Sequence, residues 1–310
     1  MRNSRRCCRR SRPRRSPRPP RTVARPPRDR SRTPVQRRLT LWRRLSAMCS
    51  VRKTPRNQSM NRRTMIESPK GGVSIKGLRP TNMIVTIDGP AGSGKTTVAH
   101  SLARHLGLDS LDTGAMYRSV ALLTIEAGVS PEDHESVVAL ACDHRIDFDW
   151  DVTPPRILLD GRDVDDRLRQ SDVSEIVSRI AGIPMLRDAM VEAQRAIAAR
   201  HPRLVTEGRD QGSVVFPDAE VRFYLDADSG VRAKRRAGEM RDRGEDCDVE
   251  KIRRAIEARD RSDRGRKDAP LTIPVGAIRI DTGEMSIEEV VNLLIRHVEA
   301  WCDSKPGSES

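Results

Sequence analysis

The most chemically informative stretch of the sequence is a glycine-rich segment that follows a short apolar run at residues 83–87. Residues 89–96, GPAGSGKT, match the pattern G-x-x-x-x-G-K-[ST], in which small residues let successive backbone N–H groups bind phosphate oxygens. The run before it suits a buried strand, and Val98, Leu102 and Leu106 recur every four residues behind it, as in an amphipathic helix. We predict a nucleotide-phosphate site at a helix N-terminus, rather than a glycine-rich turn that binds nothing.

A second group of candidate residues consists of arginines in turns and at expected helix ends. They are Arg118, Arg209, Arg259, Arg264 and Arg266. A planar guanidinium group binds phosphate oxygens in pairs and stays charged, which suits a second phosphate and a phosphoryl group in transfer. A solvated helix face with pairs such as Glu257 and Arg261 would also explain the last three. However, Gly265 ends the helix inside this run, which favours a basic flap over the phosphates.

A phosphate-binding loop alone is compatible with GTPases, motor ATPases and small-molecule kinases. GTPases carry an N-K-x-D motif and a D-x-x-G motif, and this sequence contains neither. Asp226, at the end of VRFYLD, fits the acidic strand end of an ATPase. It fits an ordinary capping aspartate equally well, so the two remaining classes stay open at this point.

The elements that must position these residues alternate between strands and helices. We expect helices at about 115–127 and 132–144, and short buried strands at about 108–112, 203–208, 221–227 and 277–282. Such alternation predicts a parallel sheet with helices on both faces. Two further helix starts are indicated where a capping side chain precedes a carboxylate by three residues, Asp172 with Glu175 and Ser286 with Glu289.

Residues 144–164 are an exception to this alternation. They combine β-like runs, two prolines and an Asp-Gly turn without helical periodicity, which predicts a small antiparallel excursion inserted in the α/β core. The expected fold is therefore α/β, with a P-loop NTPase-like parallel sheet flanked by helices and a small inserted subdomain. No apolar run approaches the length of a membrane span, so we expect no membrane partner.

The charge of the chain divides sharply near Pro80. Residues 1–80 contain 26 Lys and Arg and only two acidic residues, whereas residues 81–310 contain 32 basic and 42 acidic residues. The first part is rich in Arg, Pro and Ser and poor in apolar side chains, so we expect it to be disordered. A true start at Met65 or Met83, with the upstream residues an over-extended translation, is an equal alternative.

The composition of residues 1–80 is typical of three functions: a nucleic-acid-binding arm, a transit peptide and an export signal. The export signal fails because Arg43 and Arg44 interrupt the apolar stretch after three residues, where a signal needs roughly 7–15.

The six cysteines show no C-x-x-C spacing, so neither a zinc site nor a disulfide framework is indicated. A reducing cytosol suits them, and we expect a cytoplasmic protein.

Four segments, TIDGPAGSGKTT, LDTGAMYR, EGRDQGSVVFPDA and RDRSDRGRKDAPL, occur in this order and closely resemble bacterial cytidylate kinases. These are P-loop nucleoside-monophosphate kinases, and the similarity runs from about Met83 to near Trp301. The third segment is far more specific than the phosphate loop. The resemblance implies a kinase domain over residues 81–310, with a monophosphate-binding insert at about 143–182 and an arginine-bearing lid at about 243–270.

The resemblance also implies a role for each matching residue. The ATP phosphates would be bound by Gly89, Pro90, Ala91, Gly92, Ser93, Gly94, Lys95, Thr96 and Thr97, with Lys95 on the β- and γ-oxygens and the Thr96 hydroxyl near Mg²⁺. Lys95, Arg259 and Arg266 would be catalytic. CMP would be bound by Thr113, Arg118, Ser178, Arg187, Arg209, Asp210 and Asp263. Thr113 stands where the family often has serine, and it keeps the hydroxyl.

The implied reaction transfers the γ-phosphoryl group of ATP to CMP or dCMP, with Mg²⁺ as cofactor, and gives CDP or dCDP and ADP. No general base is assigned, because a phosphate monoester has a second pKa of about 6 and is already ionised at neutral pH. A kinase for UMP or AMP is the alternative within the class. A nucleic-acid-binding ATPase is the alternative outside it, although we expect nucleic acid to bind only non-specifically through residues 1–80. We expect a monomer.

Overall fold

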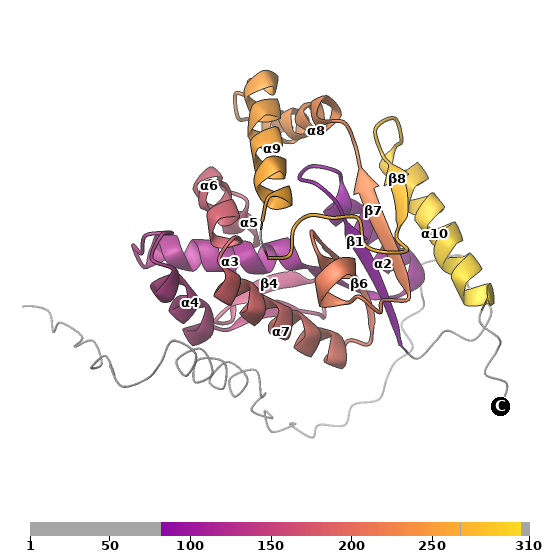
Figure 1. Ribbon diagram of the computed structural model, residues 1–310, viewed down its shortest axis with the longest axis horizontal. Helices are drawn as coiled ribbons and strands as arrows, with labels where there is room; N and C mark the ends of the chain where they lie inside the picture. Colours follow the sequence, from indigo (N-terminus) through magenta and orange to yellow (C-terminus); the bar gives the residue numbers. More distant parts are fainter. Residues whose placement is uncertain (1–81, 243, 267, 305–310) are drawn as a thin grey trace, which may run out of the picture. The chain divides into compact units, whose positions relative to one another are not determined.

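The computed structural model describes residues 82–242, 244–266 and 268–304 (Figure 1). The disorder predicted for residues 1–80 lies outside the described residues. The central sheet has five strands in the order β2-β6-β1-β7-β8, and every neighbouring pair is parallel. The strands are β1 (Met83–Asp88), β2 (Asp109–Asp112), β6 (Arg203–Gly208), β7 (Val221–Asp226) and β8 (Ile278–Asp281).

One face of this sheet is covered by α2 (Lys95–Leu106) and α10 (Ile287–Ser304), which lie side by side (Figure 1). Val85 and Ile87 of β1 point to this face and are fully buried. The stripe Val98, Leu102 and Leu106 of α2 packs against them, as its four-residue spacing predicted. This apolar layer holds the helix that follows the phosphate loop.

The other face is covered by α3 (Thr113–Glu126), α7 (Pro184–Arg200) and a short π-helix, η1 (Gln211–Val215). Here β1 presents Thr86 and Asp88, which alternate with the apolar residues of the first face. The Asp88 carboxylate accepts hydrogen bonds from the backbone N–H groups of Gln211 (2.8 Å) and Gly212 (2.7 Å). Asp88 therefore fixes the start of η1 against the central strand.

A second, three-stranded sheet lies in the stretch predicted to be an antiparallel excursion. It comprises β3 (Ile146–Asp149), β4 (Arg156–Leu159) and β5 (Arg162–Asp163), paired antiparallel. The predicted Asp-Gly turn joins β4 to β5, with φ of 52° at Asp160 and 81° at Gly161. Buried side chains of this sheet pack beside α3 and α5 (Asp165–Leu168).

Two helices, α8 (Ser229–Asp242) and α9 (Val249–Arg264), pack against each other beyond the carboxyl end of β7 (Figure 1). We call them the α8–α9 hairpin. The carboxylate of Asp248 caps α9 through the Glu250 N–H (2.9 Å), and the helix ends at Arg264 with Gly265 as its C-cap, as the sequence predicted. The hairpin thus brings the arginine run of α9 to the same end of the sheet as the phosphate loop.

The remaining helices in the described part of the chain are α4 (His134–Asp143) and α6 (Ser171–Ile180). The predicted capping pair of Ser286 and Glu289 is confirmed at the start of α10, where each residue accepts the other's backbone N–H. The pair of Asp172 and Glu175 is wrong: α6 begins at Ser171, and Asp172 instead binds Arg167 through both oxygens, at 2.7 and 2.5 Å. Among the described residues, no helix is long and apolar enough to cross a membrane.

Candidate active site

The site lies where the carboxyl ends of the parallel strands meet. The register places Asp88 beside Gly208, and Asp112 beside Glu207. The chain leaves β1 directly into the phosphate loop, residues 89–97. Ligands of open α/β sheets bind at this edge, where strand order reverses around the first strand.

Glycine is required at two positions of the phosphate loop. A Cβ atom on Gly89 would lie 2.1 Å from the backbone oxygen of Leu225, so the loop crosses the neighbouring strand too closely for any side chain. Gly94 has φ of 83° and turns the chain directly into α2 at Lys95. The first backbone N–H groups of α2 therefore point at the space above the sheet edge, as an anion site requires.

Lys95 is buried beneath this loop, with 5% of its surface exposed. Its Nζ donates hydrogen bonds to the backbone oxygen of Pro90 (2.7 Å) and to Ser93 Oγ (3.4 Å). Burial, together with the positive charges of Arg209 and Arg259, lowers the pKa of Lys95 to about 7. Both hydrogen-bond partners of Lys95 are neutral oxygens, and a bound polyphosphate would give its ammonium group an anionic partner.

A carboxylate pair stands opposite the Thr96 hydroxyl, which donates to Glu207 Oε1 (2.8 Å). Burial, and then the nearby charge of Asp112, raises the pKa of Glu207 to about 7. Although burial opposes it, Arg118 holds the pKa of Asp112 below its usual value, and Arg118 Nη2 binds Asp112 Oδ2 at 2.8 Å. The site thus holds an oxygen cluster that is short of positive charge.

Four arginines gather across from the phosphate loop, and we call them the arginine cluster. They are Arg118, Arg209, Arg259 and Arg266. Asp263, 1% exposed, binds Arg209 Nε at 3.1 Å and Arg266 Nη2 at 2.5 Å. Burial and then the charge of Arg209 lower the pKa of Arg259 to about 10, and its buried Nε has no hydrogen-bond partner among the described residues. The four arginines carry more positive charge than their two carboxylate partners, Asp263 and Asp112, compensate.

Arg187 and Asp210 form a buried ion pair behind this cluster, and each side chain is 6% exposed. Arg187 also donates to the backbone oxygen of Ala181 (3.1 Å), at the end of α6, and its guanidinium lies over the Tyr117 ring, 5.8 Å from the centroid. Ser178 lies on α6, three residues before Ala181, and is half-buried. The pair therefore ties α6, α7 and α3 to the end of β6.

Thr113 is the remaining predicted site residue. Its hydroxyl donates to the backbone oxygen of Glu207 (2.8 Å), and the side chain is buried at the start of α3. A Cβ atom on Gly208 would lie 2.8 Å from the Thr113 hydroxyl, so a larger residue there would displace the Thr113 side chain. The structure thus brings Thr113, the phosphate loop and the arginine cluster to one end of the sheet, with the Arg187–Asp210 pair beside them.

The family model for cytidylate kinase matches residues 85–300, which span the whole described site. The chain belongs to the cytidylate kinase family. It is 44% identical over 207 residues to the cytidylate kinase of Caldanaerobacter subterraneus subsp. tengcongensis, covering 67% of this chain and 90% of that protein. It is 39% identical over 223 residues to the cytidylate kinase of Methylococcus capsulatus, covering 72% of this chain and all of that protein.

Within this cytidylate kinase fold, sequence reasoning missed the carboxylates that orient the cations. Asp112, Glu207 and Asp260 are examples, and a buried arginine, Arg232, was missed with them. The sequence could have indicated Asp112 as a helix cap, because it directly precedes the Thr-Gly pair at the start of a predicted helix. Asp226, weighed as an ATPase strand end, instead accepts the Ala227 N–H (3.0 Å) and pairs with Arg279 (2.8 Å).

Proposed function

We propose that this protein transfers the γ-phosphoryl group of ATP to CMP or dCMP, through the residues that its sequence singled out. The observation that carries the assignment of roles is the convergence of cations at one end of the sheet. Arg209, after β6, and Arg259, from α9, both lower the pKa of Lys95, and Arg209 also lowers the pKa of Arg259, so the three cations lie within electrostatic reach of one another. Such excess charge, buried without enough carboxylates, fits a site for two polyanions.

On the donor side, residues 89–97 would bind the phosphates of ATP. The exposed N–H groups at the start of α2 would meet the β-phosphate, and Lys95 would leave its contact with Pro90 for the β- and γ-oxygens. Because burial lowers the pKa of Lys95 to about 7, a bound polyphosphate would increase the fraction of this side chain that is charged.

Magnesium fits the oxygen cluster beside the donor phosphates. Among the described residues, no group of three or more acidic, histidine or cysteine side chains could hold a metal ion alone. The Thr96 hydroxyl with Glu207 nearby suits Mg²⁺, which commonly binds through few protein oxygens and completes its octahedron with water and substrate phosphates. When bound, Mg²⁺ would neutralise charge on the β- and γ-phosphates.

On the acceptor side, Arg118 and Arg209 would bind the phosphate of CMP, while Arg259 and Arg266 would meet the group in transfer. Thr113 and Asp263 would lie near the acceptor phosphate and ribose hydroxyls. Ser178, Arg187 and Asp210 would read cytosine, because a hydroxyl, a cation and a carboxylate can pair with the ring O2, N3 and amino edge. The antiparallel insert and α6, at about 143–182, would form part of this acceptor site.

The chain supplies positioning and charge in this reaction rather than a base. The acceptor oxygen is already ionised near neutral pH, since the second pKa of a phosphate monoester is about 6. Lys95 and the arginine cluster would hold both anions in line and stabilise the charge on the phosphoryl group. We propose that the lid, at about 243–270, excludes water when it closes, which prevents wasteful hydrolysis of ATP.

We further propose that the enzyme acts as a monomer in the cytoplasm. The free thiols of Cys247 and Cys302 support a reducing compartment.

A coupled assay with a panel of monophosphates tests the proposed function. ADP should form in step with CDP or dCDP, CMP and dCMP should be the best acceptors, and AMP and GMP should be poor. Strong ATP hydrolysis on addition of RNA or DNA, without a nucleoside diphosphate product, would instead identify a nucleic-acid-dependent ATPase.

A further inference from the structure

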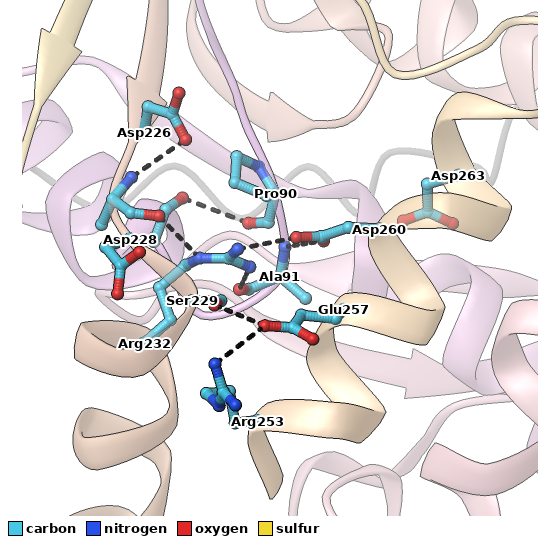
Figure 2. Close-up of polar contacts among 12 residues, drawn as sticks. Pro90, Ala91, Asp226, Asp228, Ser229, Arg232, Arg253, Glu257, Asp260 and Asp263 are labelled. Carbon is cyan, nitrogen blue, oxygen red and sulfur yellow. Dashed lines mark hydrogen bonds and ion pairs between the residues drawn. The ribbon is translucent and has the colours of Figure 1, made fainter. Parts of the chain in front are cut away.

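A buried ion pair lies outside the proposed contacts with either substrate and joins the α8–α9 hairpin to the phosphate loop (Figure 2). Arg232 of α8 and Asp260 of α9 are 4% and 3% exposed. Arg232 Nη2 lies 2.7 Å from Asp260 Oδ2. Buried ion pairs contribute little net stability compared with apolar packing, so the position of this pair calls for a reason beyond stability.

The pair binds both polar groups of one phosphate-loop residue. Arg232 Nη1 donates to the backbone oxygen of Ala91 (2.9 Å), and the Ala91 N–H donates to Asp260 Oδ1 (3.4 Å). Arg232 Nε donates to the backbone oxygen of Ala227 (2.9 Å), just after β7. One guanidinium group therefore connects three segments: the phosphate loop, the β7–α8 junction and α9.

The same side of α9 lies close to the loop at Gly92. A Cβ atom added to Gly92 would lie 4.0 Å from Ile256 Cδ1 of α9 and 3.5 Å from Arg232 Cβ of α8. Ile256 and Asp260 are four residues apart and share one helix face. Arg259 and Asp263, also four residues apart, form the adjacent row about 60° around the helix, toward the arginine cluster. Figure 2 shows Asp263 farther along α9, with no contact drawn to the pair.

We infer that Arg232 and Asp260 are positioning residues for the proposed phosphoryl transfer, on which this inference rests. They hold the phosphate loop at Ala91 and fix the rotation and height of α9. Arg259 directly precedes Asp260, so the contact with Ala91 sets where its guanidinium meets the phosphoryl group. Loss of the pair leaves the contacts with CMP in place, but it loosens the phosphate loop and separates the donor site from the catalytic arginine.

The first test is Asp260→Ala, with Glu257→Gln as its matched control. Glu257 lies on the same helix and accepts a hydrogen bond from Ser229 of α8 (2.8 Å), but this contact does not touch the phosphate loop (Figure 2). In Asp260→Ala, kcat should fall about 100-fold, the penalty expected when a reacting group is displaced by about 1 Å. The KM for ATP should rise about tenfold through the loosened loop. The KM for CMP should change less than about twofold, and the control should keep all three constants.

A double variant separates positioning from stability. Arg232→Met with Asp260→Leu removes both charges, and an apolar pair of similar volume commonly restores stability. We expect the melting temperature to return toward that of the wild type while kcat and the KM for ATP stay impaired. Recovery of both constants together with the melting temperature would overturn the proposal and make the pair merely structural.

Arg232→Lys decides the matter if the double variant does not fold. A lysine can keep its charge near Asp260, but it cannot donate to Ala227 and Ala91 at once. A raised KM for ATP and weaker ADP binding by calorimetry are expected, and wild-type values of both would overturn the proposal. Failure of the wild type to make CDP would count against the proposed function instead, since ADP binding is measured without CMP.

Discussion

At the scale of single residues, the most informative feature is a lysine that is partly neutral until its substrate arrives. Lys95 is buried, bonded to Pro90, and has its pKa lowered to about 7 by burial and neighbouring arginines. An exposed lysine would be charged at all times and would be satisfied by water. Bound phosphate favours the charged form of this lysine. The ammonium group then stabilises the bound donor and the phosphoryl group in transfer.

We expect Lys95→Ala to lower kcat by about 100- to 1,000-fold, the range observed when one donor to a developing charge is removed. The melting temperature should stay within a few degrees, because the variant also removes a poorly solvated cation. Steady-state kinetics and thermal unfolding would measure the two effects. Lys234→Ala, an exposed lysine on α8, is the control, and a near-normal kcat in Lys95→Ala would refute the assignment of the phosphate loop.

Asp88 gives a prediction about stability and pH. Burial raises its pKa from the ordinary value to about 6, although two backbone N–H groups oppose the shift. The native state therefore favours the protonated form of Asp88. The contribution of Asp88 to the free energy of unfolding is greatest below about pH 4, and it declines by up to about 3 kcal/mol as the pH rises through about 6.

Comparison of the wild type with Asp88→Asn isolates this term. Asparagine keeps one of the two backbone acceptors, and the lost bond changes stability by an amount that does not depend on pH. The difference in unfolding free energy, wild type minus variant, should fall between pH 4 and pH 7 in denaturant titrations. A difference that grows with pH over this range would show that Asp88 is not held in its protonated form.

At the scale of elements, the sequence predicted the strands and most helices because their apolar periods are short and regular. The stripe of α2 and the β-branched run of β1 each fix which face is buried. The antiparallel sheet was predicted as well, because its Asp-Gly turn has few alternatives. Asp172 failed as a cap since a nearby arginine, Arg167, competes for its carboxylate, and such a pairing depends on the folded geometry rather than on spacing.

The candidate site was predictable in its cations but not in their partners. Motif spacing identifies the phosphate loop and the arginines, because phosphate binding demands those residue types. Asp260 and Arg232 are 28 residues apart in the chain and meet only when α8 and α9 pack together. Asp210 similarly pairs with Arg187 from α7 rather than with neighbouring Arg209, which binds Asp263. Long-range pairing of this kind has no periodic signal in one sequence.

The junction of α3, α6, α7 and β6 carries the prediction about base recognition. We expect Asp210→Asn to reduce the preference for CMP over UMP by about tenfold to a hundredfold, because the carboxylate that would accept the cytosine amino group is lost. The measurement is the ratio of kcat/KM for the two acceptors at saturating ATP. Asp188→Asn, an exposed position next to Arg187 on α7, is the control. Unchanged selectivity in Asp210→Asn would place base recognition elsewhere.

At the scale of the whole molecule, residues 83–304 contain every motif and every packed element that the proposed reaction uses. The sheet begins with Met83, which is 4% exposed, pairs in register with Arg203 and donates its N–H to the backbone oxygen of Pro202 (2.8 Å). The family match, over residues 85–300, begins two residues later. The basic segment of residues 1–80 lies outside both.

We therefore expect a protein that begins at Met83 to keep kcat/KM for CMP and ATP within about twofold of the full chain. The risk lies in β1 itself, since a strand at a chain terminus can fray, and a protein that begins at Met65 controls for this. The basic segment could attract nucleotides by its charge, but such attraction is screened beyond about 8 Å at physiological salt. Measurements at low and physiological salt separate the two effects: a loss at low salt alone would reveal electrostatic attraction of substrate. A large loss at both salts, with circular dichroism unchanged, would mean that residues before Met83 belong to the active enzyme.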